Sequence, residues 1–127
     1  MNYFRSRLHA IKHAVSGIVY ILRTQPNSWL HAIATVLVLA ISFWLEISAI
    51  QWLLIILAIG LVWICEAFNT AIETAVDLAT SKYHPLAKIS KDTGAAAVLF
   101  SAITSAIIGF LVLGPPLLLR ISTYLTK

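Results

Sequence analysis

The chain combines one amphipathic segment with three long apolar segments. From Asn2 to Arg23, apolar residues recur at helical spacing on one face, with basic and polar residues on another. The apolar face holds Phe4, Leu8, Ile11, Val15, Ile18 and Leu22, and the other face holds Arg5, His9, Lys12 and Ser16. This pattern is typical of a helix that lies in the headgroup layer of a membrane. We expect a surface helix over about residues 2–23, ended by the break around Pro26.

Three segments are long and apolar enough to cross a membrane. The spacing predicts membrane-spanning helices over about residues 29–45, 49–79 and 93–119. A very short turn joins the first two spans, and a polar loop over residues 81–92 joins the last two. Pro115 and Pro116 are expected to end or kink the third span. The whole chain, residues 1–127, is predicted to form a single domain.

Composition supports this interpretation. Hydrophobic residues make up 60% of the 127 positions and charged residues only 11%, more apolar surface than a soluble domain of this size can bury. The N-terminal segment lacks a continuous apolar core and a cleavage site, so we do not expect a secretory signal peptide. The sole cysteine, Cys65, excludes an intramolecular disulfide and a cysteine-based zinc site. The fold class predicted is therefore an all-α, multi-pass membrane protein.

The second span carries an unusual polar stripe. Glu66, Asn69, Glu73 and Asp77 fall within about 80° on one helix face, at roughly 100° per residue. An ionisable side chain at the centre of a membrane helix costs about 2.5–3.5 kcal/mol. The stripe is therefore expected to face protein, water or a cation rather than lipid. Carboxylate and amide oxygens are also the ligands that Mg²⁺ prefers.

Lysine and arginine residues predict the orientation. Seven of them fall on one side of the predicted spans, and two on the other. The first group is Arg5, Arg7, Lys12, Arg23, Lys82, Lys88 and Lys91, and the second is Arg120 and Lys127. The positive-inside rule places the N-terminus, the polar loop and the end of the stripe in the cytoplasm, and the C-terminus on the opposite side.

The residues alone leave three interpretations of the stripe open. One carboxylate could act as a general base on a lipid hydroxyl while a second holds Mg²⁺ and lysines neutralise phosphate. Alternatively, Glu73 and Asp77 form a solvated helix end, and Glu66 pairs with a lysine. In the third interpretation, Glu66 belongs to a proton or cation path in a non-catalytic oligomer. The common phosphate-binding motifs of soluble kinases are absent from the sequence.

Two groups of residues resemble a known family. They are Glu66-Ala-Phe-Asn69-Thr-Ala-Ile-Glu73-Thr-Ala-Val-Asp77, and Tyr83-His84-Pro85-Leu86-Ala87-Lys88 with Lys91-Asp92. Together with the order of the spans, they resemble the prokaryotic diacylglycerol kinase family, which includes the undecaprenol kinases. The resemblance covers nearly the whole chain. It implies a bacterial inner-membrane lipid kinase that works as a homotrimer with sites shared between subunits, and no nucleic-acid partner.

The resemblance also implies roles for individual residues. Glu66 would be the general base on the lipid hydroxyl, Glu73 would hold the Mg²⁺ that accompanies ATP, and Asn69 would give polar support. The nucleotide site would be lined by Glu73, Tyr83, His84, Lys91 and Asp92, with Lys91 on the phosphates.

The sequence departs from the family at one position. The family often has a second metal-binding Glu in a Thr-Glu-x-Asn context, which reads Thr24-Gln25-Pro26-Asn27 here. Gln25 would thus be an uncharged metal ligand, if it is one. The loop from Tyr83 to Lys88 is closer to the undecaprenol branch than to the diacylglycerol branch, so undecaprenol is favoured slightly as the lipid alcohol.

Overall fold

The computed structural model describes the backbone of residues 2–126 and the side chains of residues 5–126. The predicted places of the Phe4 side chain and of Lys127 lie outside these residues. Four helices follow one another: α1 (Asn2–Thr24), α2 (Pro26–Leu45), α3 (Ala49–Ala79) and α4 (Pro85–Leu125). The last three are each long and apolar enough to cross a membrane. The predicted all-α membrane fold is confirmed.

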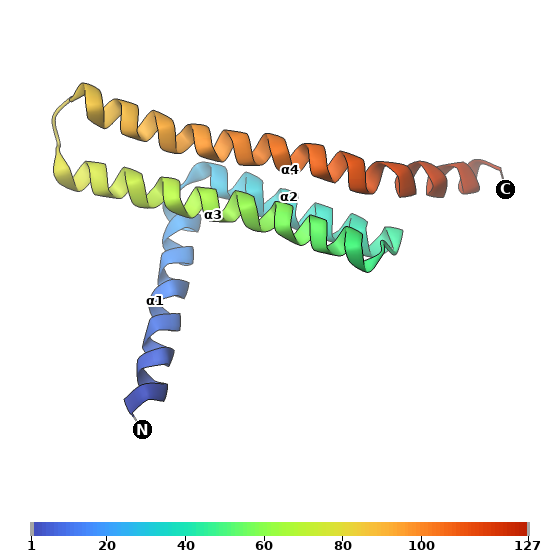
Figure 1. Cartoon of the computed structure of the whole chain (residues 1–127), viewed down its shortest axis with the longest axis horizontal. Coiled ribbons are helices and arrows are strands. Elements are labelled where there is room, and N and C mark those ends of the chain that lie inside the picture. The colour runs from blue at the N-terminus through green and yellow to red at the C-terminus, as the bar shows by residue number, and fades with distance from the viewer. Residues whose placement is uncertain (1, 127) are drawn as a thin grey trace.

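The three spanning helices run side by side, and α1 turns away from them (Figure 1). Helix α3 packs closely along α4, whereas α2 touches both more loosely. If the spans follow the membrane normal, the slant of α1 places it along the membrane surface. Its apolar residues Leu8, Ile11, Val15 and Ile18 are all more than half exposed, as expected for a face that contacts lipid.

Local sequence explains where the helices begin. Pro26 and Pro85 occupy the first turns of α2 and α4, where a missing backbone N–H costs no helical hydrogen bond. Ser48 starts α3 with a capping box: its hydroxyl accepts from the Gln51 backbone N–H, and its own backbone N–H donates to the Gln51 side chain.

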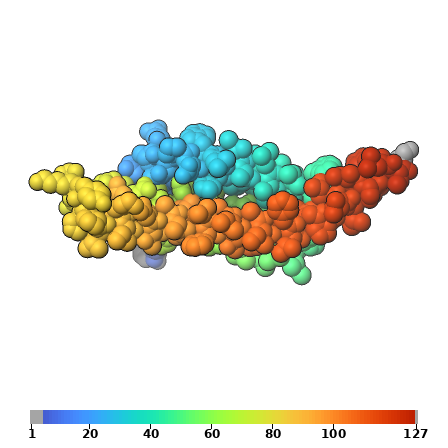
Figure 2. Space-filling model, turned by 90° about the horizontal axis from the view of Figure 1, so that it is seen from above, coloured from blue at the N-terminus to red at the C-terminus, as the bar shows by residue number. Residues whose placement is uncertain are grey.

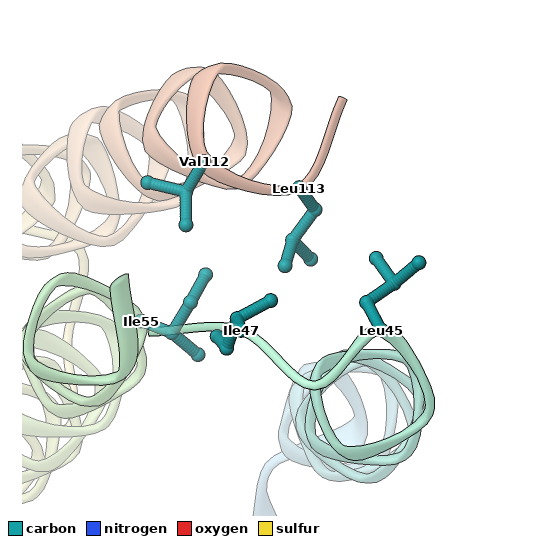
Figure 3. Close-up of a cluster of buried hydrophobic side chains, with 5 residues drawn as sticks. All are labelled: Leu45, Ile47, Ile55, Val112 and Leu113. Carbon is teal, nitrogen blue, oxygen red and sulfur yellow. The ribbon is translucent and has the colours of Figure 1, made fainter. Parts of the chain in front are cut away.

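The core lies at the end of the bundle where α2 turns into α3. Figure 3 shows five apolar side chains directed toward one another from this turn, α3 and α4. They are Leu45, Ile47, Ile55, Val112 and Leu113. This cluster fixes the α2–α3 hairpin against α4 at the end away from the polar stripe.

The predicted start of α4 is wrong, and of the two alternatives for its prolines the structure excludes an end of the helix. The helix begins at Pro85, so residues 85–92 of the expected loop are helical and the connection to α3 is only residues 80–84. Helix α4 also continues through Pro115 and Pro116 to Leu125 rather than ending there. Its last turns, red in Figure 2, are inclined to the preceding part, which agrees with the alternative of a kink.

Candidate active site

The polar stripe of α3 is divided by burial. Glu66 is 2% exposed and Asn69 7% exposed, whereas Glu73 is half-buried and Asp77 is exposed. Glu66 follows the start of α3 by 17 residues, about 25 Å along the helix axis. If α3 enters the hydrocarbon layer, about 30 Å thick, at its first residue, Glu66 lies just inside the opposite boundary. The stripe therefore leads from a buried carboxylate toward the aqueous interface.

Glu73 is the centre of a polar cluster. One of its carboxylate oxygens accepts from Gln25 Nε2 at 2.8 Å, and the other accepts from Asn69 Nδ2 at 3.1 Å. Gln25 precedes the first turn of α2, and its side chain makes no capping bond there, which leaves it free to reach α3. The structure thus brings together Glu73 and Gln25, the two expected metal ligands, with Asn69 as polar support beside them.

Gly94 of α4 covers this cluster at very short range. A Cβ atom added at Gly94 would lie 2.5 Å from Asn69 Oδ1. That oxygen is buried and makes no hydrogen bond among the described residues. A glycine is therefore required here for α4 to approach the Asn69 amide.

His31 is a site residue that sequence reasoning missed. Its Nε2 lies 3.9 Å from Glu66 Oε2, and its ring contacts Trp63 edge-on with centroids 6.4 Å apart. Among the described residues no lysine lies within ion-pair distance of Glu66, and the basic side chain beside it is His31. The available signal was that His31 alone interrupts the first apolar span.

A cavity of about 680 Å³ lies beside the α3–α4 connection. Its lining includes Asp77, Tyr83, His84, Lys88 and Lys91. Lys91 donates to Asp77 Oδ1 at 2.6 Å, which joins the α4 lysine to the end of the stripe. This cavity gathers three of the residues expected around the nucleotide.

Two of these three residues, and Asp92, have different surroundings. His84 caps α4, with Nδ1 accepting from the Leu86 backbone N–H at 3.2 Å, and Tyr83 is 81% exposed. Asp92 pairs with Lys88 one turn away on the surface of α4 and does not line the cavity. In this chain, Asp92 is therefore the expected site residue that the structure leaves apart from the others.

An apolar groove of about 510 Å³ runs between α2, α3 and α4. Small residues from α3 and α4, among them Ala58, Ala102 and Gly109, leave room for it, and His31 lines its polar end. Because His31 also faces Glu66, the groove and the buried carboxylate meet at this histidine.

Comparison with known proteins decides the family. The family model described as prokaryotic diacylglycerol kinase matches residues 12–113. The chain belongs to the prokaryotic diacylglycerol kinase family. As a member of this family, it is a lipid kinase.

Individual relatives match over most of the chain. It is 45% identical to the undecaprenol kinase of Bacillus subtilis over 116 residues, which is 91% of either chain. It is 41% identical to the diacylglycerol kinase of Synechocystis over 112 residues, covering 87% of this chain and 64% of that one. It is 43% identical to the diacylglycerol kinase of Escherichia coli K12 over 75 residues, covering 59% and 62%.

The geometry gives this lipid kinase three adjoining regions. An apolar groove reaches His31 beside Glu66, the Glu73 cluster lies two turns further along α3, and the cavity near Lys91 lies at the end of the stripe. The groove can hold a hydrocarbon chain with its hydroxyl near Glu66, the Glu73 cluster can hold a cation, and the cavity can hold a polyanion.

Proposed function

We propose that the chain transfers the γ-phosphoryl group of ATP to the hydroxyl of a membrane lipid alcohol, with undecaprenol favoured over diacylglycerol. The observation that carries the proposal is the buried Glu66 carboxylate, two turns from the Glu73 cluster and 3.9 Å from His31, which lines an apolar groove. The similarity to the Bacillus subtilis undecaprenol kinase over nearly its full length supports the choice of alcohol.

In the proposed reaction, Glu66 accepts the hydroxyl proton of the lipid alcohol. The freed oxygen forms a bond to the γ-phosphorus, the bond between that phosphorus and the β–γ bridging oxygen breaks, and ADP leaves with the electron pair. Lys91 neutralises phosphate charge after exchanging its contact with Asp77 for the nucleotide. Positioning and charge neutralisation supply most of the rate in such transfers.

The donor set fits a magnesium ion that arrives with the nucleotide. The residues 2–126 contain no group of three or more His, Cys, Asp or Glu side chains that could hold a resident metal. Glu73 nevertheless offers a half-buried carboxylate, and Asn69 and Gln25 carry amide oxygens beside it. Mg²⁺ is commonly held by one or two carboxylates together with phosphates and water. Glu73 would hold it, with Gln25 as the weaker ligand, and the ion would offset charge on the phosphates.

The proposed surroundings follow from the same residues. Basic residues on the α1 side and around the α3–α4 connection support a cytoplasmic active site in the bacterial inner membrane. The family resemblance supports a homotrimer with shared sites. Large apolar side chains exposed along all three spans are suited to lipid or to neighbouring subunits.

A phosphotransfer assay on purified protein tests the proposal. Mixed micelles would contain Mg-ATP with undecaprenol and diacylglycerol offered separately, and labelled phosphate in the lipid fraction would be counted. We expect transfer to both alcohols, faster to undecaprenol, and at least a hundredfold loss in Glu66→Gln by the range typical for general bases, about 10²–10⁴. The matched control is Glu46→Gln, which makes the same change at an exposed carboxylate at the other end of the spans.

Two results would contradict the proposal. Transfer to neither alcohol by folded protein would favour the conducting oligomer, which proton flux through Glu66 in vesicles would then test. Transfer by Glu66→Gln at the wild-type rate would show that Glu66 is not the base.

A further inference from the structure

His31 carries a polar atom that the helix packing leaves unsatisfied. The Nε2 atom is buried and makes no hydrogen bond among the described residues. Buried polar atoms without partners are rare because their desolvation is not compensated. The rest of the ring is held in place by edge-on contact with Trp63, whose Nε1 donates to Thr35 Oγ1 at 3.1 Å.

The distance between His31 and Glu66 has a specific consequence. At 3.9 Å, Nε2 and Oε2 are too far apart for a direct hydrogen bond. An oxygen atom about 2.8 Å from each of them closes a triangle with an angle near 90° at that oxygen, which a hydroxyl group tolerates. The pair is thus spaced to bind one hydroxyl group between them.

The apolar groove offers a route by which the hydroxyl of a lipid could reach this pair. His31 lines the apolar groove between α2, α3 and α4, and the other lining residues are apolar or small apart from Thr35 and Ser105. Ser105 already donates to the Ala58 carbonyl at 2.8 Å, and Thr35 already accepts from Trp63. If the hydrocarbon chain of a lipid alcohol lies in the groove, its hydroxyl group would therefore find a polar partner without a hydrogen bond at His31.

We infer that His31 binds the hydroxyl oxygen of the lipid alcohol and aims its proton at Glu66. The inference rests on the proposed function, since it takes Glu66 as the base. Nε2–H donates to a lone pair of the hydroxyl oxygen, and the hydroxyl O–H donates to Glu66 Oε2. His31 keeps its own proton throughout, and Glu66 receives the proton that the alcohol loses. A lipid without a hydroxyl at this end leaves both groups unpaired and is rejected.

Steady-state kinetics of two His31 variants test this role. His31→Ala should raise the KM for undecaprenol about tenfold, the scale of one lost hydrogen bond, and leave the KM for ATP within about twofold of wild type. His31→Gln retains an N–H donor on a side chain of similar reach, and should recover most of the affinity for the alcohol.

Trp63→Phe is the matched control for loosened packing. It removes the hydrogen bond that Trp63 of α3 donates to Thr35 of α2 but keeps an aromatic ring beside His31. We expect its KM for undecaprenol to stay within about twofold of wild type. If Trp63→Phe raised this KM as much as His31→Ala, or if His31→Gln behaved like His31→Ala, His31 would be only a packing residue.

A binding measurement separates this inference from the proposed function. Binding of radiolabelled undecaprenol in the absence of nucleotide can be measured by its retention on immobilised protein, a signal that does not depend on Trp63, which the control variant replaces. Weaker binding by about tenfold in His31→Ala, with wild-type binding in Trp63→Phe, would support the hydroxyl contact even if phosphotransfer were not observed. Equal binding by wild type and His31→Ala would overturn it, whatever the kinase assay showed.

Discussion

At the scale of single residues, the site depends on one very small side chain placed against a large polar one. Gly94 lets α4 pass directly over Asn69, whose amide in turn donates to Glu73. The Asn69 oxygen is enclosed at this point, so it has little room to move aside. The position of the proposed metal-binding carboxylate is therefore coupled to the packing of α3 on α4.

Gly94→Ala should disturb that coupling. The added methyl group must displace the Asn69 amide or push α4 outward, and we expect the KM for Mg-ATP to rise several-fold and stability to fall by about 1–3 kcal/mol. Kinetics against Mg-ATP and thermal unfolding in micelles would measure both. Gly60→Ala is the control, since nothing lies within 4 Å of its added Cβ. Equal behaviour of the two variants would show that the close approach at Gly94 is unimportant.

Gln25→Glu should change how the Glu73 cluster responds to magnesium. Two carboxylates would then face each other where Gln25 Nε2 now lies 2.8 Å from Glu73. Their repulsion should destabilise the metal-free protein, and a cation shared between them should tighten the apparent Mg²⁺ affinity. Activity titrated with Mg²⁺, and melting with and without Mg²⁺, would test this. Gln25→Ala removes the hydrogen bond without adding charge; if it shifted the titration as Gln25→Glu does, Gln25 would not be a metal position.

The sequence predicted part of this site, and there is a physical reason why it could not predict the rest. Helical periodicity correctly placed Glu66 and Asn69 on a face turned toward protein, because burial of polar groups in an apolar span leaves few alternatives. The pairing of His31 with Glu66 could not be predicted in this way. It depends on the rotation and height of α2 relative to α3, and the pattern within one helix does not contain that information.

At the scale of elements, α4 shows why charged segments and prolines misled the boundary predictions. Residues 85–92 resemble a loop in composition, yet Pro85 is favourable in the first helical turn, and Lys88 pairs with Asp92 at helical spacing. Pro115 and Pro116 remove backbone donors, but membrane helices tolerate proline when the freed groups are satisfied locally. The existence of the elements followed from hydropathy, whereas their ends depended on these local contacts.

The α2–α3 turn offers a prediction at this scale. Glu46 ends α2 with a φ of 54°, a left-handed conformation that favours glycine. Glu46→Gly should raise the free energy of unfolding by about 1 kcal/mol and leave phosphotransfer unchanged, because the turn lies at the end of the spans away from Glu66. Glu46→Ala loses the same ion pair with Arg120 but keeps the energetic cost of a left-handed backbone at a residue other than glycine. Chemical denaturation in micelles should give Glu46→Gly a higher free energy of unfolding than Glu46→Ala. The reverse order would show that the Arg120 contact or chain entropy dominates.

At the scale of the whole molecule, the site is spread along a narrow bundle. Lys91 contacts Asp77, which lies 11 residues beyond Glu66 on α3, about 16 Å along the axis. A triphosphate bridging base and lysine within one chain would require Lys91 to swing far back along α3. A neighbouring subunit that supplies one of the two groups removes this requirement, which is a physical reason to expect the shared sites that the family resemblance implies.

Mixing two inactive variants tests that expectation. Glu66→Gln subunits retain Lys91, and Lys91→Ala subunits retain Glu66, so each variant alone should be inactive. If every site takes its base from one subunit and its lysine from the next, equal random mixing gives both intact groups at about one quarter of sites. Phosphotransfer by co-expressed variants should then recover to about a quarter of the wild-type rate. Recovery should fail if both groups act within one chain, since no subunit in the mixture carries the two together. Mixing the proteins after separate purification, without exchange of subunits, is the control, because it leaves every oligomer uniform and should give no activity.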